Sequence, residues 1–548
     1  MKLVNGIGLV VLAVIGWLFS GGVGVVCAAN WVGEGERVQQ WGGFGVADRV
    51  RISFIEEGLY RVTAAELAVA TGWDEAEVVT AIATTNLALS CGGKEVAWLE
   101  HEGAMVFYGE RNKSIYAPES VYWVTPGVGR AMVWQHNPMP EPFVPQESFP
   151  AQHEEQGLVL VSRYAFSTVT NAPFATFDVV KGGPYRSSTH SVELVDVAPG
   201  LWQGSVRVAV MSDYNATMPY YEAVAEVGGA EVGRVSWYGE GYHDVTFPYW
   251  STNLNGSTAT LRLSDGLPVN MQPLKIRAFY CNNFTFEYQR LYRAVDDMLR
   301  CSGTAVTVSG FSCEDVVCVD VSDPLLTQSV GGLSYNYDPQ AEEWSVSFVG
   351  TISGLYYVCA PHNGTLSAAV RGVSDVDWAA SGVAPQYAII VPPEAWRDDF
   401  RAAVAPLAAF RATRGLRTAV IDVEDIYNRY SYGVVDPHAI RDYCAAAYRH
   451  GLRYVLLVGG GSLDFKHLKL TTTSTPAALI PTFIAGQVFE LDNSGMTVAL
   501  DAAMADIDGD GLPDIALGRL PTSNVDEVAV VVAKTIAYEA GRARWWPW

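Results

Sequence analysis

The chain has 548 residues, 49% of them hydrophobic, and its 59 acidic against 36 basic residues give a formal net charge of −23. Because single hydrophobic cores stop growing near ~250 residues, this length predicts about three domains. The excess of carboxylates repels phosphate backbones and anionic lipid alike, which excludes nucleic acid as an expected partner.

Residues 1–29 have the layout of a secretory signal peptide. Lys2 precedes an apolar run from Ile7 to Phe19, and small residues then lead to a cleavage site after Ala28 or Ala29. The alternatives are an uncleaved membrane anchor, although the apolar core is short for a ~20-residue span, and a lipid anchor on Cys27. We therefore expect an exported protein, extracellular or at the cell surface, with no membrane span after removal of the signal peptide.

Export changes how the cysteines are interpreted. The mature chain keeps an odd number of them, so at least one is unpaired or bonded outside this chain. Cys313 and Cys318 are close enough in sequence to form a disulfide, and a buried free thiol is the alternative for every cysteine. No Cys-x-x-Cys pair or neighbouring histidine supports zinc.

From residue 30 to about 380, short alternating apolar runs separated by Gly, Asn, Asp and Pro predict strands, and long helical periodicity is scarce. We divide this part into a β-rich leader domain at 30–136, a Pro-rich linker at 137–161, a β-sandwich or jelly-roll domain at 162–285, and a small β-rich domain at 286–380.

The predicted sandwich is rich in Tyr and Trp. Such modules often bind sugars through exposed aromatic side chains, so a glycan or surface ligand is one candidate partner. The alternative is that these rings fill the core and its rim. The residues concerned are Trp202, Trp237, Tyr238 and Trp250.

The period changes near residue 381, where strands begin to alternate with helices. Apolar runs at 387–391, 417–422 and 453–461 predict strands, and helical spacing lies between them. Pro406 should kink the first helix or begin its second part, whereas Asp436-Pro437 should begin the second helix. A further strand at 515–518 and a helix at 525–539 complete the region. This order predicts an α/β doubly wound parallel sheet spanning 381–548.

The stretch ADIDGDGLPD places carboxylates at alternate positions of a loop, followed by a glycine that permits a sharp turn. Ca²⁺ takes six to eight oxygen ligands and suits such a loop. The candidate metal ligands are Asp506, Asp508, Asp510 and Asp514. Leu517 stands where a full EF-hand loop carries a bidentate Glu, so the alternatives are a shorter calcium loop and a solvated acidic turn.

We assign no catalytic residue in this chain and expect no organic cofactor. Asp464 and His467 follow the third parallel strand, where catalytic groups gather in α/β folds, but no recognisable nucleophile follows them. Cys444 shares a helical stripe with Ile440 and Tyr448, which predicts a buried core thiol. The glycines at 459–461 lack the Lys-Ser/Thr of a phosphate-binding loop.

Several motifs in the same order resemble the gingipain family of secreted cysteine peptidases. They are YAIIV, RTAVIDVEDIY, GVVDPHAIRDYC, LRYVLLVGGGSLDFK, IPTF, DIDGDGLPDIALGRLP and KTIAYE, between Gln386 and Ala540. Upstream, GLYRVTAAEL, VFYGE and VYWVT look like the β-rich leader of multidomain relatives. The chain departs from the family by having Gly460 where relatives carry Asp.

The resemblance implies a fold of two caspase-like α/β subdomains, of which this chain carries the first. It also implies attack of a His-assisted thiolate on a peptide bond, but the family's Gly-His-Gly motif and nucleophilic cysteine belong to the second subdomain and have no matching positions here. We therefore expect a gingipain-like cysteine peptidase of protein or peptide substrates, inactive as this truncated chain. The alternative functions are a non-catalytic surface or glycan-binding protein with a remnant peptidase scaffold, and a relative recruited to secretion or surface attachment.

Overall fold

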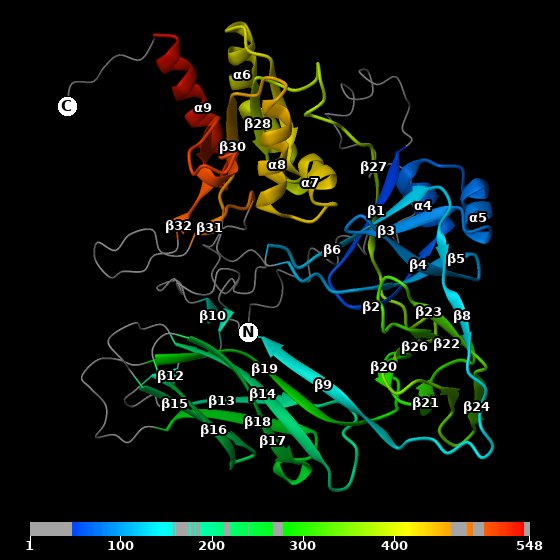
Figure 1. The fold of residues 1–548 in the computed structure, drawn as a ribbon. Coiled ribbons are helices and arrows are strands. Elements are labelled where there is room, and N and C mark those ends of the chain that lie inside the picture. Colours follow the sequence, from blue (N-terminus) through cyan, green and yellow to red (C-terminus); the bar gives the residue numbers. More distant parts are fainter. Residues whose placement is uncertain are drawn as a thin grey trace.

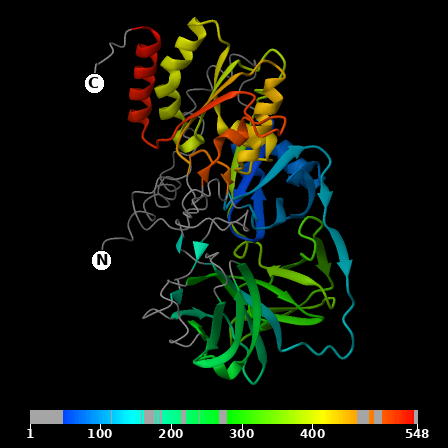
Figure 2. The ribbon, with the colours of Figure 1, turned by 60° about the vertical axis from the view of Figure 1, so that its left-hand side comes forward.

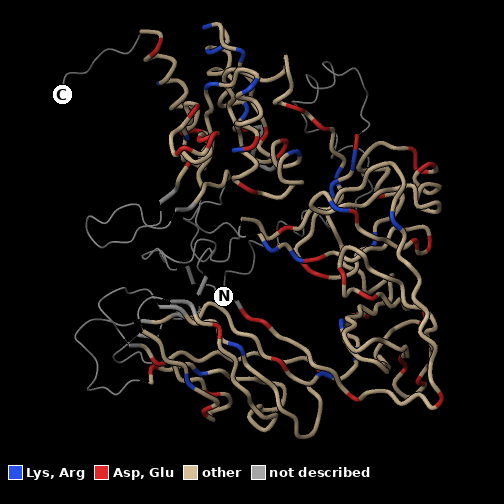
Figure 3. Tube along the Cα trace, in the orientation of Figure 1, with Lys and Arg blue, Asp and Glu red and all other residues tan. Residues whose placement is uncertain are grey.

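The computed structural model describes residues 47–114, 116–156, 159–160, 175–176, 180–181, 187–212, 220–238, 241–266, 278–461, 479–485 and 498–541. The predicted signal peptide lies outside these ranges. Within them, no helix combines the length and apolar character that a membrane span requires. Figure 3 shows Asp and Glu in each of the domains, so the acidic residues are not confined to one end of the chain.

The leader domain is an eight-stranded sheet with two helices packed on it (Figure 1). Its own strands are β1 (Arg49–Phe54), β2 (Gly58–Thr63), β3 (Leu87–Cys91), β4 (Lys94–His101), β5 (Ala104–Gly109), β6 (Ser120–Pro126) and β7 (Arg130–Ala131). The helices α4 (Ala64–Thr71) and α5 (Glu75–Ala83) were not predicted. The remaining strand, β27 (Ala369–Val373), pairs antiparallel with β1 although it falls in the segment predicted as the small β-rich domain.

The small β-rich domain consists of two sheets that also borrow a strand from outside. Its strands are β20 (Met298–Ser302), β21 (Ala305–Phe311), β22 (Val317–Asp320), β23 (Gln328–Gly331), β24 (Ser334–Asp338), β25 (Glu343–Val349) and β26 (Leu355–Cys359). The borrowed strand is β8 (Val133–His136), which pairs in parallel with β23. The chain therefore enters this domain, leaves it for the sandwich, and returns.

The sandwich has two facing sheets with strand orders β12-β19-β14-β17 and β13-β18-β15-β16. Its strands are β12 (Val180–Lys181), β13 (Ser187–Glu193), β14 (Gln203–Ser212), β15 (Tyr220–Val227), β16 (Ala230–Tyr238), β17 (Gly241–Trp250), β18 (Thr258–Asp265) and β19 (Ala278–Leu291), with short strands β10 (Val159–Leu160) and β11 (Ala175–Thr176) and the turn η1 (Ser251–Asn253) beside them. Strand β9 (Ser148–Gln156) pairs with β19, so the segment predicted as a linker at 137–161 contains a sandwich strand. Figure 1 shows β9 running diagonally from the small domain to the sandwich.

The last unit is the parallel sheet that the sequence predicts, with strand order β29-β28-β30-β33. Its strands are β28 (Tyr387–Val391), β29 (Thr418–Asp422), β30 (Tyr454–Val458) and β33 (Ala516–Leu520). Helices α6 (Glu394–Thr413) and α9 (Val525–Glu539) cover one face, and α7 (Val423–Tyr430) and α8 (Pro437–Tyr448) cover the other (Figures 1 and 2). Short elements β31 (Ile484–Ala485), β32 (Val498–Ala499) and η3 (Asp501–Met504) precede β33.

Both faces of this sheet are apolar, as a doubly wound fold requires. Ile389 and Val391 pack toward α6 and α9, while Ala388 and Ile390 pack toward α7 and α8. The α/β prediction is confirmed. Helix α6 includes Pro406 in its interior, so Pro406 does not begin a separate helix, and the kink at this residue stays a prediction.

Candidate functional site

The carboxyl edge of the parallel sheet is where an α/β fold of this kind places its ligands. At this edge β30 runs into Gly459 and Gly460, and β33 runs into Pro521. The Gly459 N–H donates to the Leu520 carbonyl at 2.9 Å, and Gly459 has φ +135°, which a residue with a Cβ rarely adopts. The backbone therefore turns sharply at the start of the glycine-rich loop that follows β30. Asp464 and His467, which the sequence placed in that loop, lie outside the described residues.

Arg519 holds this edge together. Its guanidinium makes a two-pronged contact with Asp501, Nε to Oδ2 at 2.7 Å and Nη2 to Oδ1 at 2.8 Å. It also donates to the carbonyls of Gly459 and Ile480, each at 2.9 Å, and of Pro481 at 3.2 Å. The side chain is only 9% exposed, so the planar fork fixes three loops in a largely dry environment.

The electrostatics of Asp501 follow from this contact. Burial alone raises the pKa of its carboxyl, but the hydrogen bonds and charge of Arg519, with a hydrogen bond from Thr482, hold the pKa below its ordinary value. No motif in the sequence marked Arg519 as a site residue. Its signal was a lone arginine within the otherwise apolar strand of the LGRLP motif.

No thiol described in the structure is set up as a nucleophile. Cys444 is fully buried, and burial raises its pKa to about 12, which confirms the predicted core thiol. Burial also raises the pKa of Cys301 to about 12 and raises that of Cys91, Cys281, Cys318 and Cys359. Reactive cysteines instead have lowered pKa values beside cations or helix N-termini. Cys313 is half-buried, its thiol 3.7 Å from the Asp315 carbonyl, and it is not bonded to Cys318.

The acidic loop brings together three of its four predicted ligands. Carboxylate oxygens of Asp506, Asp508 and Asp514 lie within 4.8 Å of one another, whereas Asp510 is outside this group and accepts from the Leu512 N–H at 2.8 Å. Asp506 accepts from two loop amides and Asp514 from one, so their orientations are fixed by the backbone. The loop leads directly into β33, at the amino edge of the sheet, opposite the edge described above.

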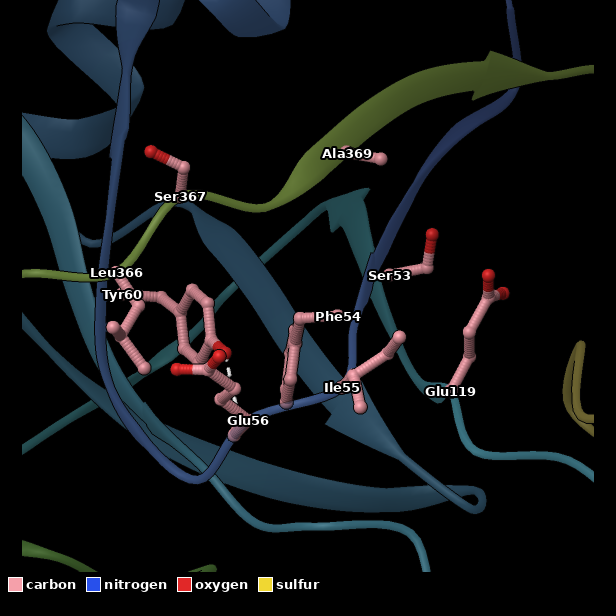
Figure 4. A pocket seen from close by; sticks show the side chains of 9 residues that line it. All are labelled: Ser53, Phe54, Ile55, Glu56, Tyr60, Glu119, Leu366, Ser367 and Ala369. Carbon is pink, nitrogen blue, oxygen red and sulfur yellow. Dashed lines mark hydrogen bonds between the residues drawn. The ribbon is translucent and has the colours of Figure 1, made fainter. Parts of the chain in front are cut away.

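A pocket of about 430 Å³ lies in the leader domain, between the end of β1 and the segment before β27 (Figure 4). Phe54, Tyr60 and Leu366 form its apolar wall, and the Tyr60 hydroxyl donates to the Glu56 carbonyl at 2.7 Å. Its lining residues include no cysteine or histidine. The pocket therefore offers no thiol chemistry.

The aromatic residues of the sandwich divide between core and surface. Trp237 is 5% exposed and stacks on Tyr221, while Tyr238 and Trp250 are 67% and 49% exposed. Tyr238 ends β16 beside the turn into β17, and Trp250 ends β17. At ~3.3 Å per residue, these two exposed rings lie at opposite ends of the hairpin and cannot clamp one sugar ring.

Comparison with known proteins agrees with this fold. Residues 381–548 match the model of Peptidase family C25. The crystal structure of dimeric latent PorU from Porphyromonas gingivalis is similar with a TM-score of 0.61 at 14% identity, covering 92% of this chain and 51% of that one. The chain thus spans about half the length of that protein. No curated protein sequence matches.

Two further structures are much less similar. The CBM36-1 domain of a multidomain xylanase from the hindgut metagenome of Trinervitermes trinervoides has a TM-score of 0.16 at 8% identity, covering 25% of this chain and 96% of that one. The ANX1 ectodomain from Arabidopsis thaliana has a TM-score of 0.20 at 8% identity, covering 44% of this chain and 78% of that one. These scores are too low to indicate a common fold.

Proposed function

Because the chain belongs, through residues 381–548, to the gingipain family of peptidases, Peptidase family C25, we propose that it forms the leader, β domains and first caspase-like subdomain of a secreted cysteine peptidase. In this assignment the parallel sheet is a scaffold, and Arg519 fixes the loops at its carboxyl edge. The thiolate and its histidine base, which together attack the peptide carbonyl, come from a second subdomain.

The state of the cysteines is the observation that carries this assignment. A nucleophilic thiol must be accessible and largely ionised near neutral pH, whereas burial raises the pKa of Cys444 and of five other described cysteines. We therefore expect the 548-residue chain alone to have no peptidase activity.

The test is to isolate the natively exported protein, measure its intact mass and map its carboxyl terminus. Casein hydrolysis under reducing conditions and labelling by an iodoacetamide probe are then compared between that protein and the 548-residue chain. We expect activity and rapid labelling only in a product that extends past Trp548, at a cysteine absent from this sequence. Rapid labelling of Cys444 or of another cysteine of this chain, with hydrolysis, would overturn the assignment.

We also propose that the acidic loop binds Ca²⁺. The support is the convergence of carboxylate oxygens from Asp506, Asp508 and Asp514, ligands that a hard cation prefers. Calorimetric titration of the full chain with CaCl₂ should give binding heat that Asp508→Ala abolishes. Asp510→Ala is the matched control and should weaken binding less, because Asp510 lies outside the group. Equal losses in both variants, or no heat in the unsubstituted chain, would contradict the proposal.

A further inference from the structure

A second cluster of metal-ligating side chains lies where the leader domain meets the small β-rich domain. We call it the histidine–carboxylate cluster: His101, Glu102, Asp315 and His362. His101 Nε2 lies 3.2 Å from Asp315 Oδ2, and His362 Nε2 lies 2.5 Å from Glu102 Oε2 and 3.7 Å from Asp315 Oδ2. Ligand atoms of His101, Glu102 and Asp315 all lie within 4.8 Å of one another. Three segments distant in sequence thus direct imidazole nitrogens and carboxylate oxygens to one place.

We propose that this cluster is a binding site for Zn²⁺ that joins the two domains. Zn²⁺ takes His nitrogen and carboxylate oxygen at about 2.0–2.2 Å in tetrahedral geometry, which places neighbouring ligand atoms about 3.4 Å apart. The separations of 3.2, 2.5 and 3.7 Å lie around that value, and His362, which lies outside the group of three convergent ligands, would rotate toward His101 to complete the tetrahedron. The mixed donor set suits zinc better than Ca²⁺, which takes oxygen ligands.

The hairpin that presents Glu102 is not explained by turn preferences alone. β4 and β5 pair His101 with Ala104, leaving Glu102 and Gly103 as a two-residue loop with φ +47° and +74°. Such turns favour Asn, Asp or Gly at the first position. A glutamate with positive φ is less stable there, because its Cβ is crowded by the backbone. Strained backbone positions of this kind cluster at functional sites, which is a reason to look for a ligand beside Glu102.

The opposite side of the cluster is held in place by a chain of hydrogen bonds. Asn363, next to His362, donates to Ser312 Oγ at 3.1 Å, and Ser312 N–H and Oγ both donate to the Asp297 carboxylate at 2.6 Å. The loops that carry Asp315 and His362 are therefore fixed against each other before any ion binds. Such support is what a metal site requires of the residues around its ligands.

Charge also favours a cation at this place. Among the described residues, the ion-pair partners of Glu102 and Asp315 are His101 and His362, with no lysine or arginine. The two carboxylates therefore converge without a permanently charged basic partner, and a divalent ion would supply positive charge between them. The side chains of His101 and Glu102 are 19% and 55% exposed, so an ion can enter from solvent.

The experiment is a calorimetric titration of the full chain with ZnCl₂ after dialysis against EDTA. We expect stoichiometric binding that Glu102→Asn and Asp315→Asn each weaken by at least about tenfold, as expected when a metal site loses one of its supports. Glu102→Asn suits the tight turn, so this variant should fold at least as well as the parent. The matched control is Glu314→Gln, an exposed acid beside Asp315, which should leave the affinity unchanged.

Two further measurements make the result specific. Co²⁺ in place of Zn²⁺ should give the visible absorption of a tetrahedral ion, and Glu102→Asn should abolish it. Asp508→Ala should leave Zn²⁺ binding intact, which separates this site from the acidic loop. Absence of Zn²⁺ binding, or parent-like affinity in both Glu102→Asn and Asp315→Asn, would overturn the proposal.

Discussion

Arg519 shows how a single side chain can take the place of a regular hydrogen-bond ladder. At the carboxyl edge of the sheet, the loop after β30 and the segment before β31 present carbonyls that need hydrogen-bond donors from outside the strand ladder. Arg519 supplies them to Gly459, Ile480 and Pro481 while its charge is balanced by Asp501. Lysine could not reproduce this, because it lacks the planar fork.

The lowered pKa of Asp501 predicts a pH dependence of stability. A carboxyl whose folded pKa lies below its unfolded value of about 3.9 stabilises the protein above that pH, and this contribution is lost as pH falls through the folded pKa. Asp501→Asn should therefore lower the free energy of unfolding at pH 7, and its difference from the parent should shrink below about pH 4. Urea titrations of the full chain at several pH values measure both effects. Asp442→Asn, at an exposed site, is the control and should show neither.

The neighbouring residues Gly459 and Gly460 should respond in opposite ways to alanine. Gly459 has φ +135°, and a Cβ there would lie 2.9 Å from the Leu479 Cβ. Gly460 has an ordinary φ, and the nearest atoms to its Cβ would be those of Pro521 at 3.8 Å. Gly460→Ala should stabilise by about 0.4–1 kcal/mol through the unfolded state, whereas Gly459→Ala should destabilise by more than that. Thermal melts of the two variants measure the change in stability. A change of the same sign in both variants would contradict the backbone argument.

At the scale of elements, capping residues in the sequence correctly predicted where helix α8 begins. Asp436 caps α8 by accepting from the His438 N–H, with Pro437 in the first turn, as the sequence predicted. The same kind of signal was missed at α4, where Thr63 and Glu66 form a capping box inside a region otherwise typical of strands. Helix α4 has only eight residues, too short for its apolar period to stand out.

The contact between the leader domain and α7 is the element-scale feature that sequence could not show. Glu424, in the first turn of α7, accepts from Arg51 of β1 at 2.7 Å and also pairs with Arg371 of β27. Nearby, the Trp123 indole N–H donates to the Tyr432 carbonyl at 2.8 Å. These pairs span more than 50 to about 370 positions of sequence, and no local pattern encodes such a separation.

Glu424→Gln should loosen this contact. The side chains of Glu424 and Arg51 are 12% and 13% exposed, so removal of the carboxylate takes away the nearest counter-charge of a largely buried guanidinium and should cost roughly 3 kcal/mol. Glu119→Gln is a matched control on the same arginine, because Glu119 is 51% exposed and 3.9 Å away, and it should cost less than about 0.5 kcal/mol. Hydrogen exchange should rise in β1 and α7 for the first variant alone. Equal exchange in both variants would show that the pairing does not hold the domains together.

At the scale of the whole molecule, the sequence predicted the kinds of unit better than their limits. Alternation of apolar residues fixes strand character, and the change of period near residue 381 fixes the start of the α/β unit, because both are local properties. Strand partners are not local. β8, β9 and β27 each pair with a strand that is distant in sequence. Domain boundaries drawn from composition therefore assigned these three strands to the wrong segment. The histidine–carboxylate cluster was missed for the same reason, since its members come from three separate loops.

These long-range strand pairings predict which fragments of the chain can fold on their own. The sandwich core draws on residues between Ala151 and Tyr288, so a fragment of residues 148–291 contains all of its strands and should unfold cooperatively on heating. A fragment of residues 47–136 lacks β27 and the apolar side chain of Leu366, which packs against the leader core. Its β1 edge is left unpaired, and such an edge invites self-association. We expect this fragment to lack a cooperative transition by circular dichroism and to oligomerise.

The matched comparison is a leader fragment to which residues 365–375 are joined through a flexible Gly-Ser linker. The added segment restores the antiparallel pairing of Arg49–Ser53 with Ala369–Val373 and should recover a cooperative melt and a monomeric state in light scattering. If the leader fragment is equally stable with and without the added strand, the leader domain does not need β27 to fold. If only the joined form folds, the leader cannot complete its sheet until the chain has passed through the sandwich and the small domain. The leader would then fold after both of these domains, although it precedes them in sequence.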